Sequence, residues 1–325
     1  MNTQSNSNLN TSNHAVVPPA PSDTHKSSDG PKKGFDMKQI VTDKIIALLE
    51  KGGNTLSKSW SCGKRGMPIN AKTGESYHGV NVFLLWSELI DFEYAQNRWL
   101  TFKQAHELGG KVRKGERGVM CCYYNVVNRK QESDSNQLED GKNTYSLIKP
   151  FWLFNLAQID GLPEEITKKA IGNDFDPNLR ADEIIKATQV NILHGFASAY
   201  YVPTKDKICL PDPDKFSSSA SYYATALHEL THWTGAKSRL NRDFSGRFGD
   251  EAYAFEELIA DLGAAYLCAE TGLIDGTLES HAAYLENWLT ILKKDKTAIF
   301  TASKQASMAF DYVMQCVNAA HQQAA

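Results

Sequence analysis

The pattern of hydrophobic and polar positions separates a polar N-terminal tail from a long ordered region. Residues 1–34 are rich in Ser, Asn, Thr and Pro and contain almost no large apolar side chains, so this segment is predicted to be disordered. From Met37 to Leu49, apolar residues recur at the spacing of one helix face. Residues 80–97 and 101–108 predict two further helices, and Thr101 is placed to cap the second one.

Two β-rich segments follow these helices. Residues 119–127 and 145–156 are enriched in β-branched and aromatic side chains. They enclose a polar and charged stretch at 128–143. This arrangement predicts a hairpin whose two strands are joined by a long loop.

The second half of the chain has a different, mainly helical pattern. Residues 161–180, with Pro and Gly, are typical of a linker, and a helix from 181 to about 194 and a short strand pair within 199–210 come next. The fold class is therefore expected to be α+β. We expect an N-terminal α+β domain at 35–160, followed by a mainly helical domain at 181–325.

The two halves of the chain also differ in net charge. The whole chain has a formal net charge of −3, but residues 31–150 have a net charge of +6 and residues 151–325 have one of −8. A basic part joined to an acidic part indicates that one module binds a polyanion and that the other module has a different function.

Cysteine usage and hydropathy bear on the compartment. The six cysteines form no C-x-x-C pair, and the first residues contain no apolar signal segment. No stretch approaches the run of about 18 apolar residues that a membrane span needs. We therefore expect a reducing compartment, the cytoplasm, and no membrane partner.

The sequence His228-Glu229-Leu230-Thr231-His232 is an H-E-x-x-H motif in a segment that predicts a helix. Residues four apart lie on one helix face, so both imidazoles can bind one metal ion. Glu229 is then placed to act as the general base for a bound water. The alternative is a surface helix with two unrelated histidines.

A third ligand is expected on the next helix, which is predicted from Tyr253 to Thr271. We choose Glu257, although helical geometry alone leaves Glu256 open. Asp261 lies one turn further on and can accept the spare N–H of a ligating His, for which His228 is our choice. The alternative is a solvated acidic helix face, but apolar neighbours surround both carboxylates.

A His₂Glu ligand set is typical of Zn²⁺, and Mn²⁺ or another divalent ion can occupy such a site in vitro. With an open position for water, the predicted reaction is amide hydrolysis. The strand Lys207–Leu210 precedes the motif helix, and we expect it to pair as an edge strand with an extended peptide substrate.

Single-stranded DNA binding requires a positive groove and aromatic platforms for bases. The candidate cations are a Gly-bounded cluster and an upstream pair, namely Lys111, Arg113, Lys114 and Arg117, and Lys64 and Arg65. Trp60 and Tyr77 lie in turn-rich sequence and are the preferred platforms, whereas Trp86, among leucines, is predicted to be core. A solvated basic turn is the alternative. Binding should weaken steeply with salt.

These motifs resemble known families. The motif with Glu257-x-x-x-Asp261 resembles the gluzincin pattern of thermolysin-like metallopeptidases. The chain from about 35 to 320 resembles the ArdC antirestriction proteins of conjugative plasmids. The segments that carry this second resemblance are Pro68-Ile69-Asn70, Thr73-Gly74, Tyr77-His78-Gly79-Val80-Asn81, Trp99-Leu100-Thr101-Phe102-Lys103-Gln104, Gly110-Lys111-Val112-Arg113-Lys114-Gly115-Glu116 and Leu153-Phe154-Asn155-Leu156-Ala157-Gln158.

The ArdC resemblance implies a domain that binds single-stranded DNA and is shared with TraC-type plasmid primases, followed by a zincin-like metallopeptidase domain. It also implies that the protein protects incoming plasmid DNA from restriction, with a restriction-system component as a candidate protein substrate. Double-stranded DNA is an alternative ligand that the sequence does not exclude. Two alternatives remain: a non-enzymatic DNA-binding protein with a structural metal site, and, ranked last, a DNA-processing enzyme.

Overall fold

The computed structural model describes residues 36–51, 66–128, 144–168, 176–244, 251–273 and 281–324. The predicted tail at 1–34 and the predicted hairpin loop lie almost entirely outside these residues, as do the candidates Trp60, Lys64 and Arg65. Among the described residues, no helix has both the length and the apolar character required to cross a bilayer.

The N-terminal part is built on a four-stranded sheet with the strand order β1-β2-β5-β4. The strand β1 pairs with β2 in parallel, and the remaining neighbours are antiparallel. A two-stranded antiparallel sheet joins β3 and β6. The strands are β1 (Ile69–Asn70), β2 (Arg98–Thr101), β3 (Lys111–Val112), β4 (Val119–Asn128), β5 (Thr144–Asn155) and β6 (Ile159–Asp160). The observed β4–β5 pair matches the predicted hairpin strands to within one residue at each end.

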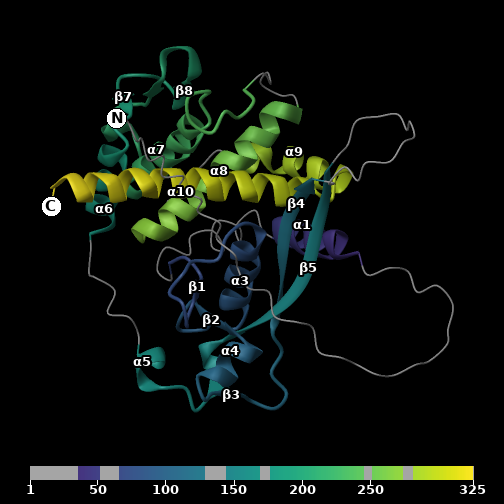
Figure 1. Ribbon diagram of the computed structural model, residues 1–325. Coiled ribbons are helices and arrows are strands. Elements are labelled where there is room, and N and C mark those ends of the chain that lie inside the picture. The colour runs from purple at the N-terminus through teal and green to yellow at the C-terminus, as the bar shows by residue number, and fades with distance from the viewer. Residues whose placement is uncertain are drawn as a thin grey trace, which may run out of the picture. The chain divides into compact units, whose positions relative to one another are not determined.

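Helices pack on both faces of this sheet (Figure 1). The helices and the 3₁₀ turn of this part are α1 (Met37–Lys51), α3 (Val80–Asp91), α4 (Phe102–Glu107), η2 (Leu156–Gln158) and α5 (Glu164–Thr167). Trp86 is 1% exposed on α3, which confirms its prediction as a core residue. The side chain of Thr101 accepts a hydrogen bond from the backbone N–H of Gln104 at 3.1 Å, which confirms the predicted cap of α4.

The helix predicted at 80–97 ends earlier, at Asp91. Glu93 has a φ of 50°, which a continuing right-handed helix does not allow. Residues Arg98–Thr101 instead form β2, because they pair with β1 on one side and with β5 on the other. This strand was not predicted, since its pairing partners are distant in the sequence.

The C-terminal part is mainly helical, and the predicted α+β class is confirmed. The helix α8 packs against both α7 and α10 (Figure 1). The helices are α6 (Pro177–Ala187), α7 (Ser219–Thr234), α8 (Glu251–Thr271), α9 (His281–Lys294) and α10 (Ala298–Ala324). The helix α8 ends at Thr271, as predicted, and Gly272, with a φ of +76°, follows it.

A three-stranded sheet precedes α7, with the strand order β7-β9-β8. Its strands are β7 (Asn191–Leu193), β8 (Tyr200–Val202) and β9 (Lys207–Cys209), and the 3₁₀ turns are η3 (Pro203–Lys205) and η4 (Pro213–Lys215). The prediction that the strand starting at Lys207 is an edge was wrong. Because β9 pairs in parallel with β7 and antiparallel with β8, its backbone groups are used on both sides.

The helices α7 and α8 approach each other closely at Gly263. A Cβ added there would lie 2.5 Å from Cγ2 and 2.9 Å from Oγ1 of Thr231 on α7. Thr231 is fully buried, and its Oγ1 donates a hydrogen bond to the carbonyl oxygen of Leu227 at 2.9 Å, so this side chain has no room to turn away. Glycine is therefore required at this crossing point.

We expect Gly263→Ala to destabilise the protein by about 1–3 kcal/mol, because the added methyl group forces the two helices apart. The midpoint of thermal unfolding measures this loss. The double variant Gly263→Ala/Thr231→Ala should recover most of it, since it removes both clashing atoms. A single variant as stable as the wild type would contradict the close approach.

Candidate metal centre and adjoining surfaces

The helix α7 presents the two histidines of the H-E-x-x-H motif. It begins at Ser219, and the side chain of the preceding Ser218 accepts a hydrogen bond from the backbone N–H of Ser221 at 3.1 Å. The imidazole rings of His228 and His232 are buried, with centroids 4.9 Å apart. This separation is what residues one helical turn apart produce.

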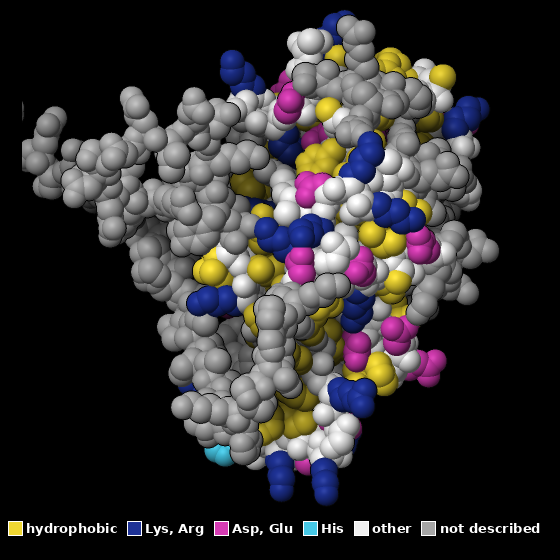
Figure 2. Space-filling model, turned by 90° about the vertical axis from the view of Figure 1, so that its right-hand side faces the viewer, with side chains coloured by type: hydrophobic (Ala, Val, Ile, Leu, Met, Phe, Trp, Pro, Cys, Tyr) yellow, Lys and Arg dark blue, Asp and Glu magenta, His cyan; other side chains and the backbone are white. Residues whose placement is uncertain are grey.

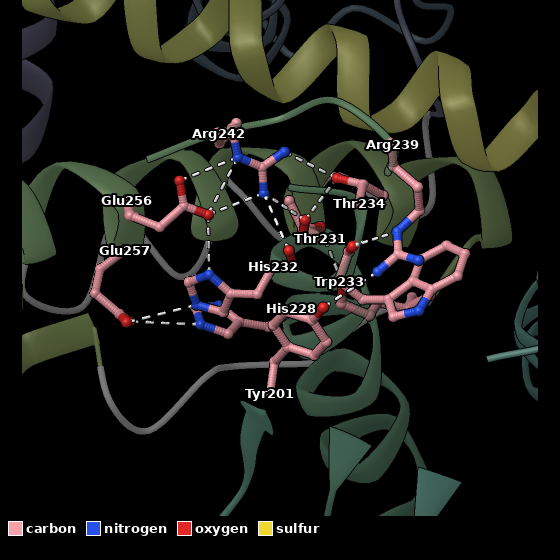
Figure 3. Close-up of polar contacts among 11 residues, drawn as sticks. Tyr201, His228, Thr231, His232, Trp233, Thr234, Arg239, Arg242, Glu256 and Glu257 are labelled. Carbon is pink, nitrogen blue, oxygen red and sulfur yellow. Dashed lines mark hydrogen bonds and ion pairs between the residues drawn. The ribbon is translucent and has the colours of Figure 1, made fainter. Parts of the chain in front are cut away.

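Glu257 on α8 lies opposite both rings (Figure 3). One carboxylate oxygen is 3.5 Å from Nε2 of His228, and the other is 3.5 Å from Nε2 of His232. One ligand atom from each of the three residues lies within 4.8 Å of the other two. The structure thus brings Glu257, rather than Glu256, to the Nε2 atoms of both histidines.

The opposite nitrogen of each ring meets a second carboxylate. Nδ1 of His228 is 2.8 Å from Oδ1 of Asp261, the residue that the sequence analysis assigned to it. Nδ1 of His232 is 3.1 Å from Oε1 of Glu256. Carboxylates at Nδ1 fix the tautomer and ring orientation that leave Nε2 free to bind a metal.

Arg242 is a site residue that sequence analysis missed. Its side chain is 3% exposed, and its guanidinium donates to both carboxylate oxygens of Glu256 at 2.9–3.2 Å. It also donates to the carbonyl oxygen of Thr231 at 2.6 Å and to the hydroxyl of Thr234 at 2.9 Å (Figure 3). Arg242 therefore neutralises the buried carboxylate that orients His232. A lone Arg in an irregular segment gives no sequence signal of this kind.

Charges within this cluster shift its pKa values strongly. Burial lowers the pKa of His228, but the adjacent Asp261 and Glu257 carboxylates outweigh it and hold the pKa well above its usual range. Burial likewise opposes the charge of His232, and hydrogen bonds to Glu256 and Glu257 still raise its pKa to about 9. Burial favours the neutral form of Glu257, yet the two imidazoles hold its pKa well below the usual value.

These donors fit a divalent metal ion. Two imidazole nitrogens and one carboxylate oxygen converge in a buried place, and both histidines have carboxylates at Nδ1. A buried carboxylate between two imidazoles requires a balancing positive charge, which protons or a metal ion can supply. The chemistry of the donor set thus suits an ion of the Zn²⁺ or Mn²⁺ kind.

A cavity of about 540 Å³ opens onto this cluster. Its lining includes both histidines, Glu229, and residues Tyr200 and Tyr201 of β8. Burial raises the pKa of the Glu229 carboxyl, and the charges of His228 and His232, with a hydrogen bond from the backbone of Tyr201, partly oppose this. Glu229 is therefore a buried carboxyl group that faces open space beside the two imidazoles.

Arg239 contacts Tyr201, which lines the cavity (Figure 3). Its guanidinium lies 3.9 Å above the ring of Trp233 and donates to the carbonyl oxygen of that residue at 2.7 Å. It also donates to Asp206 and to the hydroxyl of Tyr201, at 3.0 Å and 3.1 Å. The Tyr201 hydroxyl in turn donates to Asp206 at 2.8 Å. These contacts fix β8 against the end of α7.

We expect the stabilisation that a bound metal gives to increase with pH. A His with a raised pKa stabilises the metal-free fold fully below about pH 6.5, and this contribution is lost as the pH rises through about 9 for His232. A metal binds only the neutral ring, so its apparent affinity should rise by at least about tenfold per pH unit across this window. Calorimetric titration with Mn²⁺ between pH 6.5 and 8.5 measures this; a flat profile would contradict the raised pKa.

The predicted DNA-contacting cations lie at the surface of the N-terminal part. Lys111, Arg113, Lys114 and Arg117 are all exposed. Arg113 already pairs with Glu116 at 2.8 Å and with Asp160 at 3.3 Å, so its charge is locally balanced.

Tyr77 is placed differently from the expectation of a free stacking platform. It packs against the hydrophobic core, and its hydroxyl accepts a hydrogen bond from Nδ2 of Asn70 at 3.3 Å. Burial raises the pKa of this hydroxyl well above its usual value. Tyr77 is therefore partly buried, and its use as a stacking platform stays a prediction.

The fold and the site define a protein with a zincin-like domain. Residues 179–305 match the family model described as "Zincin-like metallopeptidase", and residues 35–154 match the "N-terminal domain of anti-restriction factor ArdC". The chain belongs to the ArdC antirestriction family, which confirms the resemblance noted in its sequence.

Three relatives support this assignment. The crystal structures of the ArdC protein from plasmid R388, one metal-free and one bound to Mn(II), are 40% identical to this chain, cover 87% of it over 98% of their own length, and superpose with a TM-score of 0.70. Protein y4eC of Sinorhizobium fredii, uncharacterized, is 34% identical over 87% of this chain and 93% of its own length. The Escherichia coli DNA primase TraC is 37% identical over 87% of this chain, but the match spans only 20% or 27% of the primases.

Proposed function

We propose that this ArdC-like antirestriction protein hydrolyses peptide bonds at the cluster between α7 and α8 and binds single-stranded DNA with its N-terminal domain. The observation that carries the first part is the convergence of His228, His232 and Glu257 beside the buried carboxyl of Glu229. The second part is supported by the net charge of +6 over residues 31–150 and by kinship with the primase TraC.

In this proposal, His228, His232 and Glu257 hold one Zn²⁺ ion, and Asp261 and Glu256 keep the two imidazoles oriented. The ion supplies Lewis acidity, which makes water a nucleophile near neutral pH and polarises a carbonyl. The carboxylate of Glu229 accepts a proton from the attacking water and transfers it to the nitrogen of the departing amine. Burial suits Glu229 to this task, because a raised pKa brings it closer to the working pH.

The open cavity favours a catalytic site over a purely structural one. Structural zinc sites are closed by four protein ligands, whereas catalytic sites keep one position open. Here three ligands face a space of about 540 Å³. Both β7 and β8 are edge strands of the described sheet, and β8 is the one that lines the cavity, so we infer that an extended peptide adds at its outer edge.

The peptidase proposal is tested with purified, metal-loaded protein and an unfolded protein substrate, with the products identified by mass spectrometry. Chelation of the metal should stop cleavage, and adding Zn²⁺ back should restore it. The proposed natural substrate is a component of a restriction system, which a second experiment tests by incubation with purified restriction subunits. Cleavage that persists in chelator would overturn the metal-dependent mechanism.

For DNA binding, we expect affinity for a labelled single-stranded oligonucleotide to fall steeply as salt increases, because phosphate contacts release counterions. Lys114 and Arg117 are exposed, and replacing either one by Ala should reduce the slope of log affinity against log salt concentration by about one. Fluorescence anisotropy across a salt series measures this. A parallel series with double-stranded DNA decides the preference, and affinity independent of salt would contradict the proposed cationic surface.

A further inference from the structure

Three aromatic side chains form a contiguous patch at the outer face of the N-terminal sheet, which we call the aromatic surface: Phe102, Trp152 and Phe154. Phe102 is 62% exposed and Trp152 is 49% exposed. The rings of Phe102 and Phe154 lie 6.3 Å apart, edge to face. A Cβ added at Gly118 would lie 3.0 Å from Phe154 and 3.1 Å from Trp152, so this glycine lies between the two.

The strand register explains why these rings face outward. On β5, Leu153 points into the core and is fully buried, so its neighbours Trp152 and Phe154 point to the other face. Phe154 pairs across the sheet with Leu100, which is itself buried and belongs to the small core beneath α4. Trp152 lies two residues before Phe154 on β5, pairs with Met120 of β4, and keeps much of its side chain open to solvent.

Positively charged side chains lie next to residues of the aromatic surface in the sequence. Lys103 follows Phe102, and Arg117 precedes Gly118; both are exposed. Figure 2 shows that hydrophobic side chains and Lys and Arg side chains occur together at the surface on the lower part of the side that it draws, where Asp and Glu side chains also lie. Exposed Trp and Phe beside cations match the chemistry of unpaired bases and phosphates.

We propose that bases of single-stranded DNA stack on Phe102 and Trp152 while Arg117 and Lys103 contact the adjacent phosphates. The inference rests on the proposed binding of single-stranded DNA, and it assigns the stacking of bases to rings other than Tyr77, while Arg117 remains one of the proposed cations. Stacking requires unpaired bases, so the aromatic surface selects single strands over duplexes.

The test measures the affinity of the full-length protein for a labelled oligo(dT) strand at one fixed salt concentration. Trp152→Ala and Phe102→Ala are each expected to weaken binding by about 5- to 100-fold. Trp152→Phe should retain most of the affinity, because a phenyl ring still stacks. Circular dichroism and thermal unfolding check that each variant folds.

Phe92→Ala provides a matched control. Phe92 is 60% exposed, close to the value for Phe102, but it follows α3 and stacks on Tyr94, which contacts Trp99. Trp99 is buried in the main core, whereas Phe154 packs on the small core under α4. This variant should bind oligo(dT) like the wild type. An equal loss in Phe92→Ala would contradict a specific aromatic surface.

The outcomes separate the two proposals. A wild type that does not bind oligo(dT) overturns the proposed DNA-binding function itself. A wild type that binds, with Trp152→Ala and Phe102→Ala binding equally well, overturns only the aromatic surface. Sedimentation of the same variants adds a further outcome: loss of self-association without loss of DNA affinity would assign these rings to a second copy of the chain instead.

Discussion

Replacing Glu229 by Gln is expected to lower peptide-bond hydrolysis by about a thousandfold, within the range that general-base catalysis contributes. The amide has nearly the same shape as the carboxyl group but cannot accept a proton from water. Glu229 contacts the cavity beside the two imidazoles, yet it is not one of the three converging donors, so the metal should stay bound. Steady-state cleavage rates and metal analysis of the same preparation measure both effects.

The same variant separates an enzyme from a DNA-binding protein with a structural metal. Glu229→Gln should bind single-stranded DNA as tightly as the wild type, because α7 lies outside the segment matched by the N-terminal family model. The efficiency of plasmid transfer into a restricting host, measured for the wild type and for Glu229→Gln, then distinguishes the two functions. Protection that survives in Glu229→Gln would mean that antirestriction depends on DNA binding and not on proteolysis.

Glu257→Gln is expected to lower metal affinity by more than about 100-fold, which exceeds the 10–100-fold typical of losing an outer-shell partner. Each Nε2 atom lies 3.5 Å from one oxygen of the Glu257 carboxylate, whose charge would face an ion held between the two rings. An amide supplies a neutral oxygen, so the site loses one negative charge. Competition titration with a chromophoric chelator measures the change.

The matched control is Glu256→Gln, at the neighbouring position on the same helix. Glu256 contacts Nδ1 of His232 and the guanidinium of Arg242 and does not face the ion. Its loss should cost about 10–100-fold in metal affinity by releasing the orientation of His232. A larger loss in Glu256→Gln than in Glu257→Gln would reverse the assignment of the third ligand, which helical geometry alone left open.

The features that the sequence predicted well depend on local spacing. Thr101 and Gln104 form a cap within one turn, and Gly272 ends a helix by its own backbone conformation. The sheet elements were harder. The strand Arg98–Thr101 and the central position of β9 depend on partners far along the chain, and no local pattern specifies such pairing.

By itself, the sequence determined which donor side chains the proposed metal centre can use. The spacing of His228 and His232, and of Glu257 and Asp261, places each pair on one face of its helix, because the helical repeat is fixed by backbone geometry. Only the tertiary structure decided which glutamate faces both rings, that Arg242 neutralises the other one, and that Trp152 is exposed while Tyr77 is partly buried. These outcomes follow from how separate elements pack, and packing is set by contacts between residues that are distant in the sequence.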